Sequence, residues 1–170
     1  MYRYQILVEY VGTKFVGWQK QLKGKSIQKE IENKLSKLLK QKITIYGSGR
    51  TDAGVHALEQ SAHFDTKLNI KEVQRLIKSL NFFLNPKKIS IINIYKRKKQ
   101  FHARYSVKER IYKYFIINRL AAPTLENERA WHIRKKLDIK LLKEGAKKLV
   151  GTHDFSTFRA SNCYAKSPVK

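Results

Sequence analysis

The chain has 170 residues, and 37 Lys and Arg against 13 Asp and Glu give it a formal net charge of +24. This charge predicts a polyanionic partner, most simply a nucleic acid, although a lysine-rich proteome could supply part of it. The single cysteine, Cys163, excludes an internal disulfide framework, and no apolar run approaches the ~20 residues of a membrane span. The first residues form no signal-peptide pattern, so we expect a cytoplasmic protein without membrane attachment.

The first hundred residues predict secondary structure in the order β-α-β-β-α-β. Helical spacing of apolar residues indicates a first helix, at 27–39, with Ser26 as its N-cap. Asn69 and Glu72 resemble a capping box that would open a second helix. Period-2 or β-branched patterns, typical of strands, occur at 4–10, 43–46, 58–64 and 89–95.

The remaining residues predict only β-α-β. We expect a strand at 109–118, with Tyr112 and Tyr114 on one face, and another that starts at 153–158. The helix between them would be capped by Asp138 and stopped by Gly151. The predicted fold is therefore α+β.

We interpret this order as two ferredoxin-like units that flank a central cleft, at 1–100 and 101–170. The second unit would be incomplete. Its open sheet edge predicts a chain that is less stable than one with a finished sheet.

The glycine-rich stretch 47–57 is the strongest candidate for a functional loop, because Arg50 and Asp52 lie two positions apart in it. Glycine lets a backbone turn tightly or approach a ligand, and an adjacent Arg keeps a carboxylate ionised. A charged carboxylate on a loop between apolar segments suits catalysis. The ordinary alternative is a surface turn in which Asp52 caps its own backbone.

Four segments resemble, in family order, the motifs of the tRNA pseudouridine synthases that modify the anticodon stem-loop. One of them departs from the family pattern, since Val11 stands where the family usually has Asp. The family normally continues beyond the last motif, so the resemblance implies a shortened form of the enzyme, whose activity is open. The four segments are 10–19, 47–57, 101–104 with 110–114, and 151–160.

The resemblance implies isomerisation of uridine to pseudouridine at tRNA positions 38, 39 and 40 by a homodimer. Asp52 matches the catalytic aspartate, acting as nucleophile or base, and the atom it attacks stays open. Arg50 matches a motif arginine that would keep Asp52 ionised and fill the space left by the flipped base. The reaction gains no atoms and changes no redox state, so we expect neither a metal nor a cofactor.

The resemblance also assigns a substrate-binding group. Tyr112 matches the active-site tyrosine, whose ring would stack on the flipped uracil, although a strand tyrosine is also an ordinary core residue. Arg110, two residues earlier, would meet a phosphate. The rest of the group belongs to the glycine-rich loop: Gly54, Val55 and His56.

A catalytically silent RNA-binding fragment is the second hypothesis, because RRM-type modules share the β-α-β-β-α-β order. Against a simple RRM, the first unit lacks paired aromatic-rich strands and carries Asp52 instead. The five histidines have no zinc-ligand spacing. Gly47-Ser48-Gly49 is not followed by the Lys-Ser/Thr of a nucleotide phosphate loop.

Overall fold

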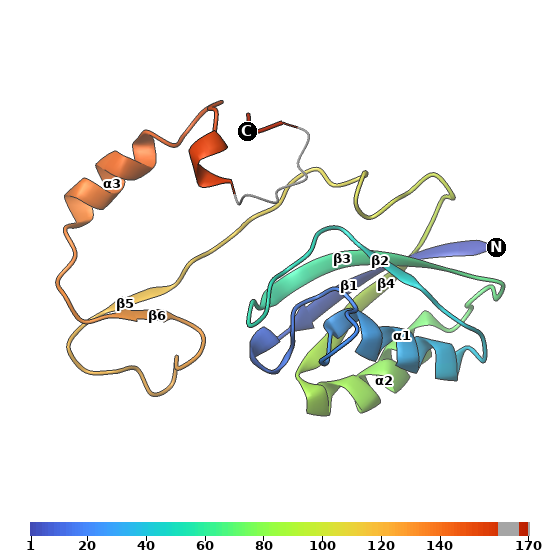
Figure 1. Ribbon diagram of the computed structural model, residues 1–170. Helices are drawn as coiled ribbons and strands as arrows, with labels where there is room; N and C mark the ends of the chain where they lie inside the picture. Colours follow the sequence, from blue (N-terminus) through green and yellow to red (C-terminus); the bar gives the residue numbers. More distant parts are fainter. Residues whose placement is uncertain (160–166, 170) are drawn as a thin grey trace. The chain divides into compact units, whose positions relative to one another are not determined.

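The computed structural model describes residues 1–159 and 167–169, and the chain divides into two compact units, Met1–Lys113 and Tyr114–Lys170 (Figure 1). The chain is α+β, as predicted. Cys163 lies outside the described residues. In the described ranges, no helix has the length and apolar character needed to cross a membrane.

The first unit is a four-stranded antiparallel sheet with two helices packed on one face (Figure 1). Its strands lie in the spatial order β2-β3-β1-β4. The order along the chain confirms the predicted β-α-β-β-α-β. The elements are β1 Tyr2–Tyr10, α1 Ile27–Leu38, β2 Ile45–Gly47, β3 Ala57–Thr66, α2 Val73–Leu84 and β4 Ile89–Arg97.

The core lies between this sheet and its two helices. Alternate residues of β1 point inward, since side chains alternate across a strand, and Tyr4, Ile6 and Val8 are wholly buried. They meet apolar residues at helical spacing on α1 and α2, of which Ile27, Ile31, Leu35, Leu80 and Leu84 are wholly buried. The predicted cap of α1 is confirmed, because Lys29 N donates to Ser26 Oγ at 3.3 Å.

The predicted capping box of the second helix is wrong. The helix α2 begins at Val73, and Glu72 at its N-cap position makes no capping side-chain hydrogen bond. Asn69 bonds elsewhere, because its Oδ1 accepts from Lys96 Nζ at 2.9 Å. Ile70 N donates to the Tyr4 hydroxyl at 2.8 Å. Bonds to β1 and β4 therefore hold this segment out of the helix.

The second unit departs further from the prediction. Only the last three residues of the expected strand 109–118 form β5, Ile116–Asn118, which pairs in parallel with an unpredicted strand, β6 Trp131–Ile133. Within the described ranges no strand pairs with 109–114, and Phe115 O accepts a single hydrogen bond from Trp131 N at 2.8 Å, so that segment stays irregular. The expected strand start at 153–158 is instead a 3-10 turn, Ser156–Phe158.

The helix α3, Ile139–Lys147, confirms the predicted cap but not the predicted stop. Asp138 Oδ1 accepts from Lys140 N at 2.8 Å and from Leu141 N at 3.1 Å. The helix ends at Lys147, two residues before Leu149, where it would end if Gly151 were the residue after the cap. None of the residues of α3 is buried, so the described core lies in the first unit.

Candidate active site

The loop that carries Asp52 joins β2 to β3 and packs against the loop that joins β1 to α1. Trp18 N donates to Thr51 O at 3.1 Å, and the Tyr10 hydroxyl lies 2.8 Å from Thr51 Oγ1. On the far side of Asp52, Gly12 N donates to His56 Nδ1 at 3.0 Å. Bonds on both sides of Asp52 therefore fix the course of this loop.

Two glycines allow the loops to approach this closely. A Cβ on Gly12 would lie 2.0 Å from Val55 O, and one on Gly17 would lie 2.4 Å from Thr51 O. Both distances are impossible for a real side chain, and Gly17 also has a φ of +105°. The glycines of the 10–19 segment thus serve the geometry of the Asp52 loop.

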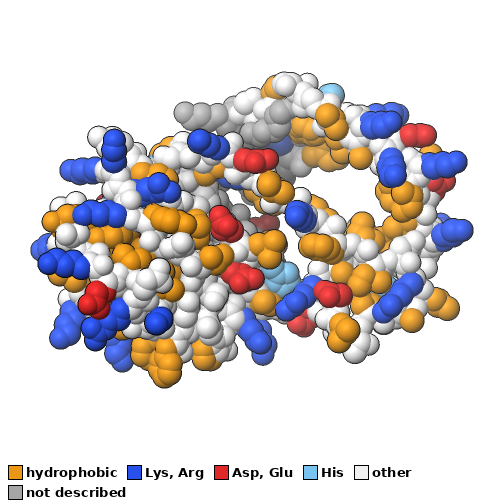
Figure 2. All heavy atoms as spheres, turned by 180° about the vertical axis from the view of Figure 1, so that it is seen from behind, with side chains coloured by type: hydrophobic (Ala, Val, Ile, Leu, Met, Phe, Trp, Pro, Cys, Tyr) orange, Lys and Arg blue, Asp and Glu red, His pale blue; other side chains and the backbone are white. Residues whose placement is uncertain are grey.

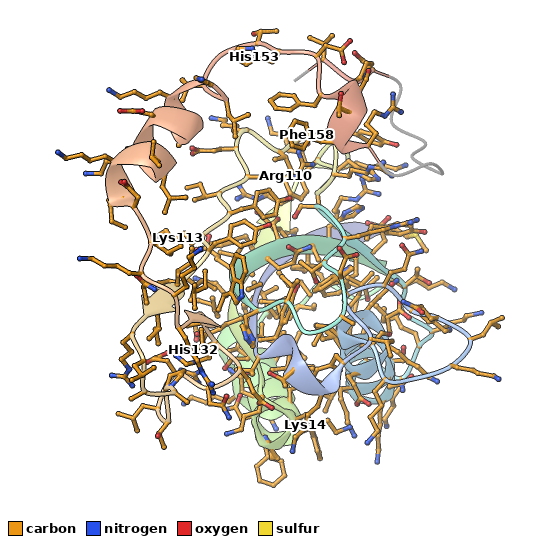
Figure 3. All side chains as sticks on the ribbon, turned by 60° about the vertical axis from the view of Figure 1, so that its left-hand side comes forward. Lys14, Arg110, Lys113, His132, His153 and Phe158 are labelled. Carbon is orange, nitrogen blue, oxygen red and sulfur yellow. The ribbon has the colours of Figure 1, made fainter. Side chains whose placement is uncertain are left out.

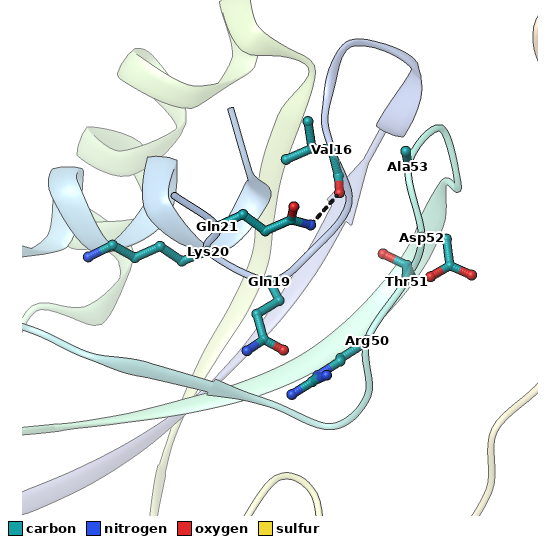
Figure 4. A pocket seen from close by; sticks show the side chains of 8 residues that line it. All are labelled: Val16, Gln19, Lys20, Gln21, Arg50, Thr51, Asp52 and Ala53. Carbon is teal, nitrogen blue, oxygen red and sulfur yellow. Dashed lines mark hydrogen bonds between the residues drawn. The ribbon is translucent and has the colours of Figure 1, made fainter. Parts of the chain in front are cut away.

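A polar hollow of about 580 Å³ opens beside Asp52 (Figure 4). Asp52 and Arg50 are both exposed there. Figure 4 shows the Arg50 side chain extending toward Gln19, while the Asp52 carboxylate points away from it. The lining residues are Val16, Gln19, Lys20, Gln21, Arg50, Thr51, Asp52 and Ala53.

The expected pair of Arg50 with Asp52 is not formed in this arrangement. Throughout the described residues, no ion pair or hydrogen bond joins their side chains. Arg50 can therefore influence the carboxylate only through its longer-range field, which solvent screens. Its guanidinium is free of Asp52 and faces the hollow.

The structure brings Arg110 to this loop and leaves Tyr112 exposed. Arg110, labelled in Figure 3, lies in the irregular segment before β5, and its Nη2 donates to Ser48 O at 2.9 Å. Tyr112 is 68% exposed. Gly54 has a φ of +81° and open space around it, and Val55 is also exposed. These positions leave the far side of the loop accessible to a large ligand.

The chain matches the family model for tRNA pseudouridine synthase over residues 6–106. It is 66% identical over 170 residues to the tRNA pseudouridine synthase A of Pelagibacter ubique (strain HTCC1062) and covers 69% of that relative. It is 43% identical to the enzyme of that name from Anaplasma phagocytophilum (strain HZ), again covering 69%. The chain belongs to the tRNA pseudouridine synthase family. The resemblance inferred from the four motifs is thereby confirmed.

Sequence reasoning missed one feature of this family member, a histidine cluster on the sheet face opposite the helices. His63 alternates with the core residues Ala62 and Phe64, so it points to the other face, yet it is only 1% exposed. The segment 99–106 covers it, and Ala103 N donates to His63 Nδ1 at 3.2 Å. The sequence carries no local signal for this burial, because it depends on Ala103, 40 positions away.

An arginine on β1 holds that covering segment in place. Arg3 Nη1 donates to Lys99 O and to Phe101 O, each at 2.7 Å. Its other nitrogens pair with both carboxylate oxygens of Asp65 at 2.7 and 2.8 Å. The Phe101-His102-Ala103-Arg104 motif of this pseudouridine synthase therefore binds its own sheet.

We expect the stability of the chain to fall by about 2 kcal/mol between pH 7.5 and pH 5 because of His63. Burial, then the charges of Arg3 and His102, lower the pKa of His63 to about 4. In the unfolded chain His63 takes up a proton near pH 6.5, whereas in the folded chain it stays neutral until about pH 4. Protonation therefore favours the unfolded chain, and the free energy of unfolding decreases as the pH falls from 7.5 to 5. Urea unfolding at both pH values measures this.

The matched variants are His63→Gln and His132→Gln, the second at a half-exposed position in the other unit. His63→Gln should lose most of the pH dependence in this window, and His132→Gln should keep it. An unchanged slope in His63→Gln would show that other groups cause the effect.

Proposed function

We propose that this chain converts uridine to pseudouridine at positions 38, 39 and 40 of the tRNA anticodon stem-loop. The observation that carries the proposal is the exposed Asp52 beside a polar hollow, on a loop fixed on both sides. The names of the relatives support tRNA as the substrate. A strongly basic chain suits this polyanion.

The proposed chemistry needs one carboxylate. The bond from ribose C1′ to base N1 breaks, the base turns, and a bond from C1′ to C5 replaces it. The hydrogen on C5 leaves as a proton and N1 gains one, so atoms and electrons balance. The Asp52 carboxylate serves as the nucleophile that holds the sugar or the base, or as the base that takes the C5 proton.

The remaining site residues receive binding roles in this proposal. Arg50, unpaired with Asp52 and exposed, occupies the space that the flipped base leaves in the stem. Arg110 meets a phosphate beside the loop, and Tyr112 stacks on the uracil. Gly54 and Val55 let the nucleotide approach the backbone. His56 holds the end of the loop through Gly12.

We also propose two ferredoxin-like units, expected from the sequence at 1–100 and 101–170, and a symmetric homodimer in the complete enzyme. The compact units of the structure divide after Lys113 instead, because Phe101 and Ala103 bond to the first sheet. The antiparallel order β2-β3-β1-β4 with both helices on one face supports this architecture for the first unit. The cytoplasm, which holds the tRNA, is the proposed compartment.

Release of tritium from tRNA made with [5-³H]uridine tests the function directly, because the new bond at C5 displaces its hydrogen. We expect release that depends on the uridines at 38–40 and disappears when all three are replaced by cytidine. Release that is unaffected by that replacement would refute the assigned positions. Binding of tRNA without any release would favour the silent RNA-binding fragment.

Binding of tRNA should weaken steeply with salt. Lys and Arg side chains outnumber acidic ones on the face shown in Figure 2. Each phosphate that they neutralise makes the slope of log affinity against log salt more negative by about 0.7–0.9, so four or five contacts give a slope of about −3 to −4.5. Titrations between 50 and 200 mM salt measure it.

The matched pair for this measurement is Arg110→Gln and Lys37→Gln, the latter on the exposed face of α1. Arg110→Gln should reduce the slope by about one phosphate contact, and Lys37→Gln should leave it unchanged. A slope near zero for the unaltered chain would make its positive charge a compositional accident.

A further inference from the structure

Four aromatic rings form a continuous cluster on the sheet face opposite the helices. Tyr46 stacks on His63 at 5.2 Å, His63 meets His102 at 4.6 Å, and His102 meets Tyr105 at 4.5 Å between ring centroids. The two histidines form the inner part. The tyrosines at the ends are 50% and 78% exposed. The cluster therefore presents two ring faces that nothing in the first unit covers fully.

The rings are held before any ligand arrives. Tyr46 and His63 are directly opposite one another on β2 and β3. Tyr105 N and Ser106 N both donate to His102 O, at 3.0 and 2.7 Å, which closes a tight turn around the exposed ring. Such preorganisation lowers the entropy cost of binding.

The cluster lies beside the catalytic loop. Tyr46 precedes Ser48 by two residues, or about 7 Å along a strand, and Ser48 O is the atom that Arg110 binds. The chain continues from Tyr105 to Arg110, five residues later. A nucleotide close in the RNA chain to one beside Asp52 can therefore reach these rings.

Charge identifies the class of ligand. Arg104, Lys108 and Arg110 are exposed on the same segment as Tyr105. Exposed aromatic faces bordered by cations are the arrangement that binds single-stranded nucleic acid, since bases stack on the rings and phosphates meet the cations. A partner helix would instead need a contiguous apolar groove.

We propose that Tyr105 and Tyr46 form a stacking site for an unpaired base of the RNA that neighbours the target uridine. This proposal rests on the proposed function. It adds a second contact to the one beside Asp52, and it gives the Phe101-His102-Ala103-Arg104 motif a role in presenting the ring of Tyr105.

The test measures how tightly the 170-residue chain binds a fluorescently labelled anticodon stem-loop. Tyr105→Leu should raise the Kd about tenfold or more, because stacking of one base is worth about 1–3 kcal/mol. Tyr105→Trp should preserve binding. The matched control is Phe82→Leu, at an exposed aromatic on α2 that is 75% exposed and pairs only with Phe83 among the described rings.

Two further readouts separate stacking from folding. A 2-aminopurine placed in the RNA loop should lose fluorescence on binding to the unaltered chain and keep it with Tyr105→Leu. In the tritium assay Tyr105→Leu should raise KM and leave kcat within about twofold. The thermal midpoint of Tyr105→Leu should equal that of the unaltered chain, because most of the Tyr105 ring is exposed. If the midpoint falls, the 2-aminopurine measurement on Tyr46→Leu tests the stacking site instead.

Unchanged Kd and unchanged 2-aminopurine quenching in Tyr105→Leu and Tyr46→Leu would overturn the stacking site while tritium release left the proposed function standing. An equal loss in Phe82→Leu would also overturn it, because the effect would then not be specific to this cluster. Failure of the unaltered chain to bind RNA would refute the proposed function together with the stacking site.

Discussion

Asp52→Asn should lower the rate of pseudouridine formation by at least about 10³-fold. The amide keeps the shape of the side chain but removes its charge and its ability to attack carbon or take a proton. The Kd for tRNA should change by less than about threefold, since the contacts to phosphate remain. Single-turnover tritium release and a binding titration on the same protein separate the two effects.

The matched control is Glu59→Gln, which removes an exposed carboxylate seven residues along the chain, on β3. Its rate should equal that of the unaltered chain. If Asp52→Asn turned over within tenfold of the rate of the unaltered chain, Asp52 would not be a catalytic residue, and the alternative of an ordinary turn residue would hold.

Gly12→Ala should lower both the stability of the chain and its rate of turnover. The new Cβ would lie 2.0 Å from Val55 O and 3.0 Å from Gly54 C, both backbone atoms that cannot swing aside. The loop must shift, which we expect to cost about 1–3 kcal/mol of stability. Because Asp52 lies two residues before Gly54, its displacement should also cost about 10²-fold in rate.

Gly49→Ala, in the glycine-rich stretch 47–57, is the control. Its Cβ would meet only Arg110 Nε, at an ordinary 3.7 Å, so stability and rate should stay close to those of the unaltered chain. Urea unfolding and tritium release measure both variants. Equal stability and equal rate for Gly12→Ala and Gly49→Ala would show that the contact between the two loops is not needed.

The sequence by itself determined the elements whose signals are local. The strand predicted from the alternation in β1 and the helix predicted from the apolar spacing in α1 are confirmed. Each pattern depends only on which side of a single element is buried. Ser26 and Asp138 cap their helices as predicted, since a cap bonds a backbone N–H two or three residues away. The motifs with Arg50 and Asp52 were also sufficient to indicate the family.

Only the tertiary structure decided the features that depend on residues far apart in the chain. The start of α2 moved because Asn69 and Ile70 bond to β4 and β1. The collision that makes Gly12 necessary involves Val55, and the burial of His63 depends on Ala103, 40 positions away. Most of the strand expected at 109–118 is not formed, because a strand needs a neighbouring strand to pair with, and that neighbour comes from a distant part of the chain. Local patterns thus determined β1, α1 and the caps of α1 and α3, whereas long-range hydrogen bonds and close backbone contacts set the geometry around Asp52.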